Sequence, residues 1–196
     1  MTVTLDQSTG IISAPSFRGC YQWTVLEHEN LSSSVSEVDF DVSGYTEFRD
    51  LRFDIFQLTV VTNAAHCVML ESTDGGSSYA SSYDHCVFRS DHGGTGKSPM
   101  AWSSLGTRAN HEFATGCINT AYGFANGYIE IYNWQSTTED HLFKSLFTQW
   151  QTSSNPGANF SATTITPSAA ATDYRIAASS GNLDGGDIIL SGRSAA

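Results

Sequence analysis

Two histidine–cysteine doublets are the strongest candidates for metal chemistry in this sequence: His66-Cys67 and His85-Cys86. A structural zinc site needs four converging nitrogen or sulfur ligands, usually from closely spaced pairs. The chain has no C-x-x-C or H-x-x-x-H spacing. Adjacent residues on a strand also point to opposite faces, so one doublet does not readily give both side chains to one ion. We therefore predict core cysteines beside exposed histidines, and no metal.

Acidic residues and serines offer further kinds of chemistry. Asp184 and Asp187 lie in a glycine-rich turn and could offer carboxylates to calcium, which takes six or more oxygen ligands. A hydrolytic triad needs a nucleophile, a histidine and an acid in contact, but the chain lacks a G-x-S-x-G elbow. A glycosidase needs two carboxylates across a cleft, which any two acids satisfy on paper. Because no spacing singles out a site, we expect no enzyme activity and no cofactor.

Aromatic residues near expected loop ends suit a different chemistry, the binding of sugar rings. Flat aromatic faces with polar neighbours are typical of such sites. The aromatics concerned are Trp102, Tyr79, Tyr83, Tyr132 and Trp134. Trp102 stands in a long Gly- and Ser-rich segment, residues 90–104, and long loops often carry function. We take Trp102, Tyr79 and Tyr83 as candidate ligand-binding residues; the alternative is that these rings belong to the core or to subunit contacts.

Charge and hydropathy limit the function classes. Nine basic residues face 20 acidic ones, a net charge of −11 over 196 residues. This argues against duplex nucleic-acid binding, whose footprint is basic, and against an anionic membrane surface. No run approaches the ~18 apolar residues of a membrane span. The N-terminus lacks the basic start and apolar core of a signal peptide. We therefore expect a protein folded in a reducing cytosol, with free and mostly buried thiols.

The stretch 44–79 organises the expected fold. Leu51, Phe53 and Ile55 alternate with polar residues, as in a half-buried strand. The alternation changes parity at the apolar doublet Ile55-Phe56, which indicates a β-bulge. A partner strand and a polar turn follow. Together these elements predict the centre of a sheet.

Short apolar runs broken by Gly, Ser, Asn and Asp continue along the chain, which favours an all-β sandwich or barrel. The sequence predicts a strand at 20–26, a polar loop at 27–34 and a clear strand at 127–134. The last strand is expected at 188–190. In total we count about ten strands.

One segment, 136–152, is ambiguous. Ser136 to Glu139 fits a capping box, and apolar residues then recur every four positions, as on a helix. Its C-terminal part is nevertheless rich in strand formers. Composition shows no internal boundary. We predict an N-terminal arm or edge strand at 1–16 and a single two-layer antiparallel β-sandwich at 17–196.

Several segments resemble a β-sandwich family common in virion proteins of tailed bacteriophages and gene-transfer particles. They are Trp23, SEVDF at 36–40, Gly44-Tyr45, LESTDGGSSY at 70–79, Gly116, GYIEIYNW at 127–134 and SGNLDGGDIILSG at 180–192. In this family the closing pattern is Ser-Gly-Asn, three or four residues, Gly, a strand, then Gly. The chain departs from the family at 167–173, where related chains often carry a Gly and an aromatic.

The resemblance implies a jelly-roll-like sandwich on the particle surface, in a tail fibre, a spike or a capsid decoration, often as a homotrimer among other virion proteins. It favours strand over helix at 141–152, and it implies no enzyme and no cofactor. It carries no functional residue, because the matched positions are turn glycines and core apolar residues. We expect a structural or adhesive virion protein, made in the host cytoplasm; attachment to a host-surface glycan and passive decoration of the particle both fit this expectation. A carbohydrate-binding module is the alternative, and a glycan-degrading enzyme is a third.

Overall fold

The computed structural model describes residues 4–5, 12–13, 22–91, 101–117, 124–152 and 155–194. The regular elements in these ranges are β-strands: β1 (Thr4–Leu5), β2 (Ile12–Ser13), β3 (Thr24–Leu31), β4 (Glu37–Asp41), β5 (Phe48–Val60), β6 (Ala65–Ser72), β7 (Tyr83–Asp91), β8 (Ala101–Arg108), β9 (His111–Cys117), β10 (Ala125–Tyr132), β11 (His141–Thr152), β12 (Asn155–Ile165), β13 (Asp173–Ala178) and β14 (Leu183–Ser194). Within these ranges no helix has the length and apolar character to span a membrane.

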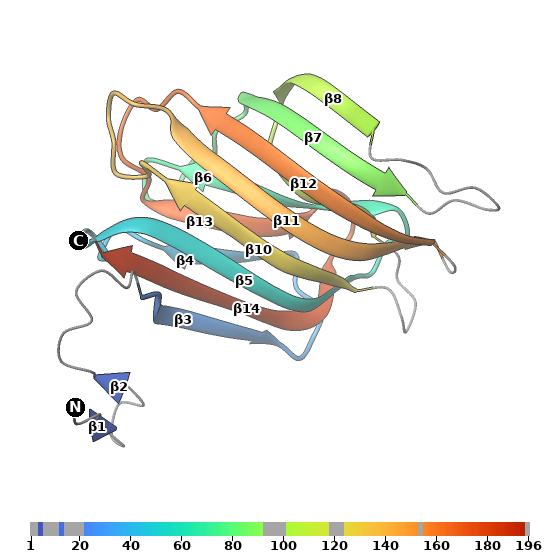
Figure 1. Ribbon diagram of the computed structural model, residues 1–196, viewed down its shortest axis with the longest axis horizontal. Coiled ribbons are helices and arrows are strands. Elements are labelled where there is room, and N and C mark those ends of the chain that lie inside the picture. Colours follow the sequence, from blue (N-terminus) through green and yellow to red (C-terminus); the bar gives the residue numbers. More distant parts are fainter. Residues whose placement is uncertain are drawn as a thin grey trace.

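Two antiparallel sheets form the layers of a sandwich. The large sheet has eight strands in the order β3-β14-β5-β10-β11-β12-β7-β8, and the small sheet has four in the order β4-β13-β6-β9. Figure 1 shows the small sheet behind one face of the large sheet, whose other face is turned to the viewer. The prediction of an all-β, two-layer antiparallel sandwich is confirmed, with twelve strands in the layers against about ten expected. Strands β1 and β2 pair with each other in a separate sheet.

Aromatic rings fill the space between the two sheets. Phe53 of β5 meets Phe40 of β4 edge-to-face, with ring centroids 5.1 Å apart, and meets Tyr174 of β13 at 5.9 Å. Phe143 of β11 packs on the same Tyr174 at 6.0 Å. All four rings are fully buried. Because each such ring removes about 150–250 Å² from water, these contacts join the large sheet to the small one.

The central strand β5 contains the predicted bulge. Ile55 lies opposite Gly127 of β10, but Leu58, three residues on, lies opposite Ala125, only two residues back along β10. The extra residue falls at Phe56-Gln57, where Gln57 has φ of 52°. The bulge returns Leu58 to the face of Ile55, and both are fully buried. Phe56 itself remains 47% exposed.

The ambiguous segment resolves into a turn and a strand. Ser136 Oγ accepts hydrogen bonds from the backbone amides of Thr138 and Glu139, at 3.2 and 2.8 Å. These are capping bonds, but no helix follows: β11 begins at His141 and pairs with β10 and β12 along its length. The choice of strand at 141–152 is confirmed. Two flanking ladders outweigh a local helical pattern, because tertiary pairing overrides propensity.

Candidate functional site

A hollow of about 320 Å³ lies at one end of the large sheet, where β11 and β12 approach their connecting hairpin. Seven residues line it: Phe124, Thr148, Gln149, Trp150, Pro156, Gly157 and Ala158. We call it the aromatic hollow. None of these residues carries a charge, in a chain whose net charge is −11. Its volume lies at the lower end of the range of about 300–1,000 Å³ for small-molecule sites.

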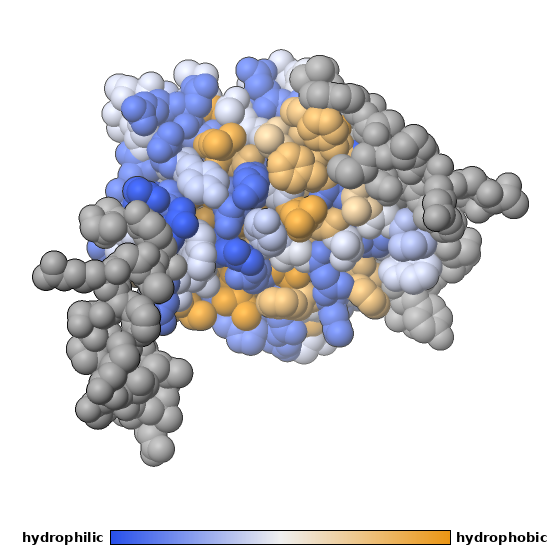
Figure 2. Space-filling model, viewed as in Figure 1, coloured by the Kyte–Doolittle hydropathy of each residue, from blue (hydrophilic) through white to orange (hydrophobic). Residues whose placement is uncertain are grey.

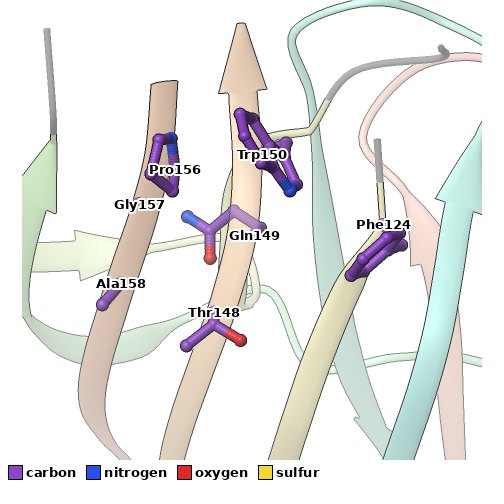
Figure 3. Close-up of a pocket in the computed structure, with 7 residues that line it drawn as sticks. All are labelled: Phe124, Thr148, Gln149, Trp150, Pro156, Gly157 and Ala158. Carbon is purple, nitrogen blue, oxygen red and sulfur yellow. The ribbon is translucent and has the colours of Figure 1, made fainter. Parts of the chain in front are cut away.

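Strand pairing places three rings of the hollow side by side. Trp150 of β11 lies opposite Pro156 of β12, and Gln149 lies opposite Ala125 at the start of β10. Phe124, which precedes β10, therefore comes level with Trp150. Figure 3 shows the rings of Pro156, Trp150 and Phe124 spread across three neighbouring segments. Trp150 and Phe124 are partly exposed, so the row offers flat apolar surface to a ligand.

Gln149 ties the strand that carries the hollow to the small sheet. It is only 2% exposed, and its Nε2 donates to the Thr115 carbonyl oxygen of β9 at 3.3 Å. Asn159 Nδ2 donates to Thr115 Oγ1 at 3.0 Å, so both side chains tie the large sheet to β9. Gln149 Oε1 is buried and has no hydrogen-bond partner among the described residues. A buried acceptor without a donor is costly. Because Gln149 adjoins Trp150 on β11, its side chain lies on the opposite face of the strand, between the two sheets, and its amide is not part of the exposed surface of the hollow.

The arrangement suits an uncharged, hydroxylated ligand. The C–H face of a sugar ring packs on flat aromatic surface such as the rings of Trp150 and Phe124. The seven lining residues of the hollow include no acid or base that could activate the Thr148 hydroxyl, so its geometry favours binding over reaction.

The three sequence-predicted ligand residues do not meet at one place. Tyr83 is 0% exposed, and its hydroxyl accepts from the Glu71 amide at 2.7 Å, so the ring belongs to the core and faces no surface site. Tyr79 lies at the surface, where the Arg175 guanidinium covers its ring at 4.3 Å. The Tyr79 hydroxyl donates to Asp39. Trp102 has its backbone paired with β7, but its side chain lies outside the described residues.

The other two candidate aromatics are also engaged. Trp134 is 1% exposed and donates its Nε1 proton to the Phe48 carbonyl oxygen at 3.1 Å. The Tyr132 hydroxyl donates a hydrogen bond to the Glu130 carboxylate.

Trp150, which lines the aromatic hollow, was not among the residues that the sequence analysis predicted. The sequence does contain a signal for Trp150: this aromatic residue lies shortly before the turn at Asn155-Pro156, so its ring is expected at the end of a strand.

The histidine–cysteine doublets follow the predicted orientation in one case and reverse it in the other. Cys67 is buried and His66 partly exposed, as expected. In the second doublet His85 is buried, at 2% exposure, whereas Cys86 is partly exposed. The reason is register: β7 presents His85 to the small sheet, where its ring lies 6.0 Å from that of His111.

The described part of the chain has no group of three or more metal-ligating side chains. Asp187, one of the two acids considered for calcium, accepts hydrogen bonds from Asn30 at 2.8 Å and has His28 at 2.9 Å. Its carboxylate thus holds the edge strand β3 to β14. Asp184 is exposed.

The outer face of the large sheet, away from the small sheet, carries an apolar patch. Cross-strand register places Leu146, Phe160 and Phe88 in one row across β11, β12 and β7. Leu142 and Ala162 complete the patch, and Figure 2 shows hydrophobic residues gathered over these strands. Leu142 and Leu146 remain 36% and 43% exposed. Beside the patch, Lys144 pairs with Glu130 and Arg52 with Asp54.

Comparisons with known proteins identify no relative. A scan of protein-family models, a search of curated proteins and a search of solved structures each found no match.

Proposed function

We propose that this chain is a structural and adhesive virion protein of the tailed-bacteriophage type, displayed on the particle surface in a tail fibre, a spike or a capsid decoration. The observation that carries the proposal is the apolar patch on an acidic molecule, in which Leu142 and Leu146 are exposed. Exposed apolar surface on a soluble protein is typical of an assembly contact. The resemblance of several segments to phage sandwich proteins also supports the proposal.

The patch also supports assembly of the chain with copies of itself, as a homotrimer. Molecules with a net charge of −11 repel one another, so copies can meet only where net charge is small. The five patch residues are uncharged. Lys144, which lies between Leu142 and Leu146 on the same face of β11, pairs with Glu130, and Arg52 pairs with Asp54. Both signs are therefore available for reciprocal pairing between copies.

Light scattering coupled to size-exclusion chromatography tests the assembly. The wild-type chain should elute with the mass of a trimer, and Leu146→Glu should elute as a monomer, because it places a charge in the apolar contact. Val25→Glu is the matched control: Val25 is 63% exposed on the edge strand β3, outside the patch. A monomeric wild-type chain, or a Leu146→Glu chain that still assembles, would contradict this part of the proposal.

Particle localisation tests the virion assignment itself. Antibody against the purified chain should label intact particles released from cells that produce it, at a fixed position on each particle. Labelling restricted to free protein would overturn the assignment. The position of the label would distinguish a tail fibre or spike from a capsid decoration.

Glycan binding at the aromatic hollow is the second candidate function, and it is compatible with an adhesive virion protein. The observation that favours it is the pair of partly exposed rings, Trp150 and Phe124, in an uncharged hollow. Neutral glycans on an array should bind the wild-type chain, and Trp150→Ala should weaken binding at least about tenfold, since Trp150 has the largest side chain that lines the hollow. Trp23→Ala is the control, because Trp23 lies beside Arg52 and Arg193, away from the hollow. Equal binding by both variants would exclude the hollow, and release of reducing ends would instead favour a glycan-degrading enzyme.

A further inference from the structure

A pair of cysteines lies in the small sheet, outside the aromatic hollow and the apolar patch. Cys67 Sγ of β6 and Cys117 Sγ of β9 are 3.7 Å apart, although the residues are 50 positions apart in the chain. Both are free thiols, 0% and 1% exposed. Two sulfur atoms at this separation need only a small side-chain movement to reach the bonding distance of about 2.05 Å.

The local backbone aims the two side chains at each other. Ala65 lies opposite Cys117, but Cys67, two residues on, lies opposite Ala114, three residues back. The extra residue is a β-bulge on β9 that includes Gly116, whose φ is 65°. Positive φ is readily adopted by glycine, and a bulge re-aims the neighbouring side chain. The bulge brings the Cys117 sulfur to Cys67.

We propose that Cys67 and Cys117 form a reversible disulfide that locks the edge strand β9 to β6 once the protein leaves a reducing environment. The oxidant is a low-molecular-weight disulfide such as oxidised glutathione. The Cys117 thiolate attacks one sulfur of that disulfide and releases one small thiolate. The Cys67 sulfur then attacks the Cys117 sulfur of the mixed disulfide and releases the second. Two protein thiols lose two electrons, and their two protons pass to the two small thiols.

The surroundings assign the roles of the two sulfurs. The hydrogen bond from Cys67 lowers the pKa of the Cys117 thiol, whereas the hydrogen bond to Cys117 and burial raise the pKa of Cys67. Cys117 is also the last residue of β9, an edge strand of the small sheet. Because strand ends open first, Cys117 is the sulfur that a dissolved oxidant reaches.

The Cys67–Cys117 disulfide would also affect Gln149 at the aromatic hollow. Strand β9 also carries Thr115, whose carbonyl oxygen accepts from Gln149 Nε2. A covalent link at Cys117 fixes the end of the strand that holds this acceptor. Oxidation should therefore stabilise the sandwich and the position of Gln149 together.

Intact-mass measurement of the full-length chain, reduced and then equilibrated with oxidised glutathione, tests the proposal. Wild-type protein and Cys86→Ser should each lose two hydrogens, and peptide mapping should find residues 67 and 117 joined. The midpoint of thermal unfolding should rise by about 5–15 °C, because the link closes a long loop in the unfolded chain. Cys117→Ser should show neither change.

The wild-type peptide map keeps the test decisive even where a serine variant folds poorly. If all thiols stay alkylatable after equilibration, or if Cys67 is found joined to a cysteine other than Cys117, the proposal is overturned. Oxidation should also quicken in dilute urea, since opening of β9 limits access to the sulfurs. A rate that falls in dilute urea would likewise count against it.

Discussion

His141 Nδ1 lies 2.8 Å from Glu71 Oε1 in the core between the two sheets, and both residues are buried. His141 Nε2 lies 2.9 Å from the Ser136 carbonyl oxygen. Since both partners are acceptors, both ring nitrogens must donate, which requires the charged imidazolium. Burial works to lower the pKa of His141, but the hydrogen bond and the charge of Glu71 outweigh burial and raise the pKa above its ordinary value of 6.5. The Tyr174 hydroxyl also donates to Glu71, at 3.1 Å.

The first prediction concerns the pH dependence of stability. A histidine whose pKa is raised on folding adds stability that is complete below its unfolded pKa, near 6.5, and is lost as pH rises through the folded value. His141→Gln should lower the free energy of unfolding by about 3 kcal/mol at pH 6, because Glu71 loses its buried partner. The loss should shrink as the pH rises above 6.5 and through the raised pKa of His141. Chemical denaturation at several pH values measures both effects.

His28→Gln is the matched control for that experiment. His28 contacts the Asp187 carboxylate at 2.9 Å, close to the 2.8 Å of the His141–Glu71 pair, but the His28 side chain is 52% exposed. Solvent screens such surface pairs, so the control should change stability far less than His141→Gln does. Equal losses in the two variants, or a His141→Gln loss that does not vary with pH, would show that the buried pair is uncharged.

The second prediction concerns a histidine whose contribution to stability is lost as the pH falls, the opposite of His141. His111 is fully buried beside His85; burial, and then the neighbouring His85, lower its pKa to about 3. The contribution of neutral His111 to the free energy of unfolding is therefore complete above about pH 6.5 and is lost as the pH falls toward 3. Between pH 6 and 4 the wild-type chain should lose about 1.4 kcal/mol per pH unit through this one group.

His111→Gln should remove that slope. A glutamine stays neutral and can still bond Thr163 Oγ1, the partner of His111 Nδ1 at 2.8 Å. The free energy of unfolding, from denaturation curves, should therefore change less between pH 6 and pH 4 for the variant than for wild type. Parallel curves for wild type and His111→Gln would mean that His111 is protonated in the folded chain.

The sequence predicted the layers of this fold better than the course of its edges. Alternation located β5 and its bulge, because buried side chains on a central strand must repeat every second residue. The polar run Glu27–Asn30 was expected to be loop, yet it continues β3 to Leu31. An edge strand buries little, so its residue types carry no alternation; its pairing with Ile188 and Asp187 of β14 determines the structure.

The site was less predictable than the fold, for a reason visible in Tyr83 and Trp150. Both are aromatics in strands, and composition does not separate a ring that faces the second sheet from one that faces water. Tyr83 turns inward and packs on Phe143 with ring centroids 6.1 Å apart. Trp150 lies at a strand end beside Phe124, where the described small sheet does not cover it. That difference depends on register with distant strands, which one sequence does not reveal.

The third prediction tests the close approach of β10 to β11. A Cβ built on Gly127 would lie 2.1 Å from the Leu146 carbonyl oxygen and 2.8 Å from Phe147 Cα, both backbone atoms. Because the backbone of β11 must move to admit a methyl group, Gly127→Ala should cost about 3 kcal/mol or more. Gly44→Ala is the control, since no atom lies within 4 Å of its Cβ position. That turn substitution should leave the free energy of unfolding within about 1 kcal/mol of wild type, as for a tolerated Gly→Ala change. Equal denaturation midpoints for the two variants would show that β10 and β11 do not pair in the register described.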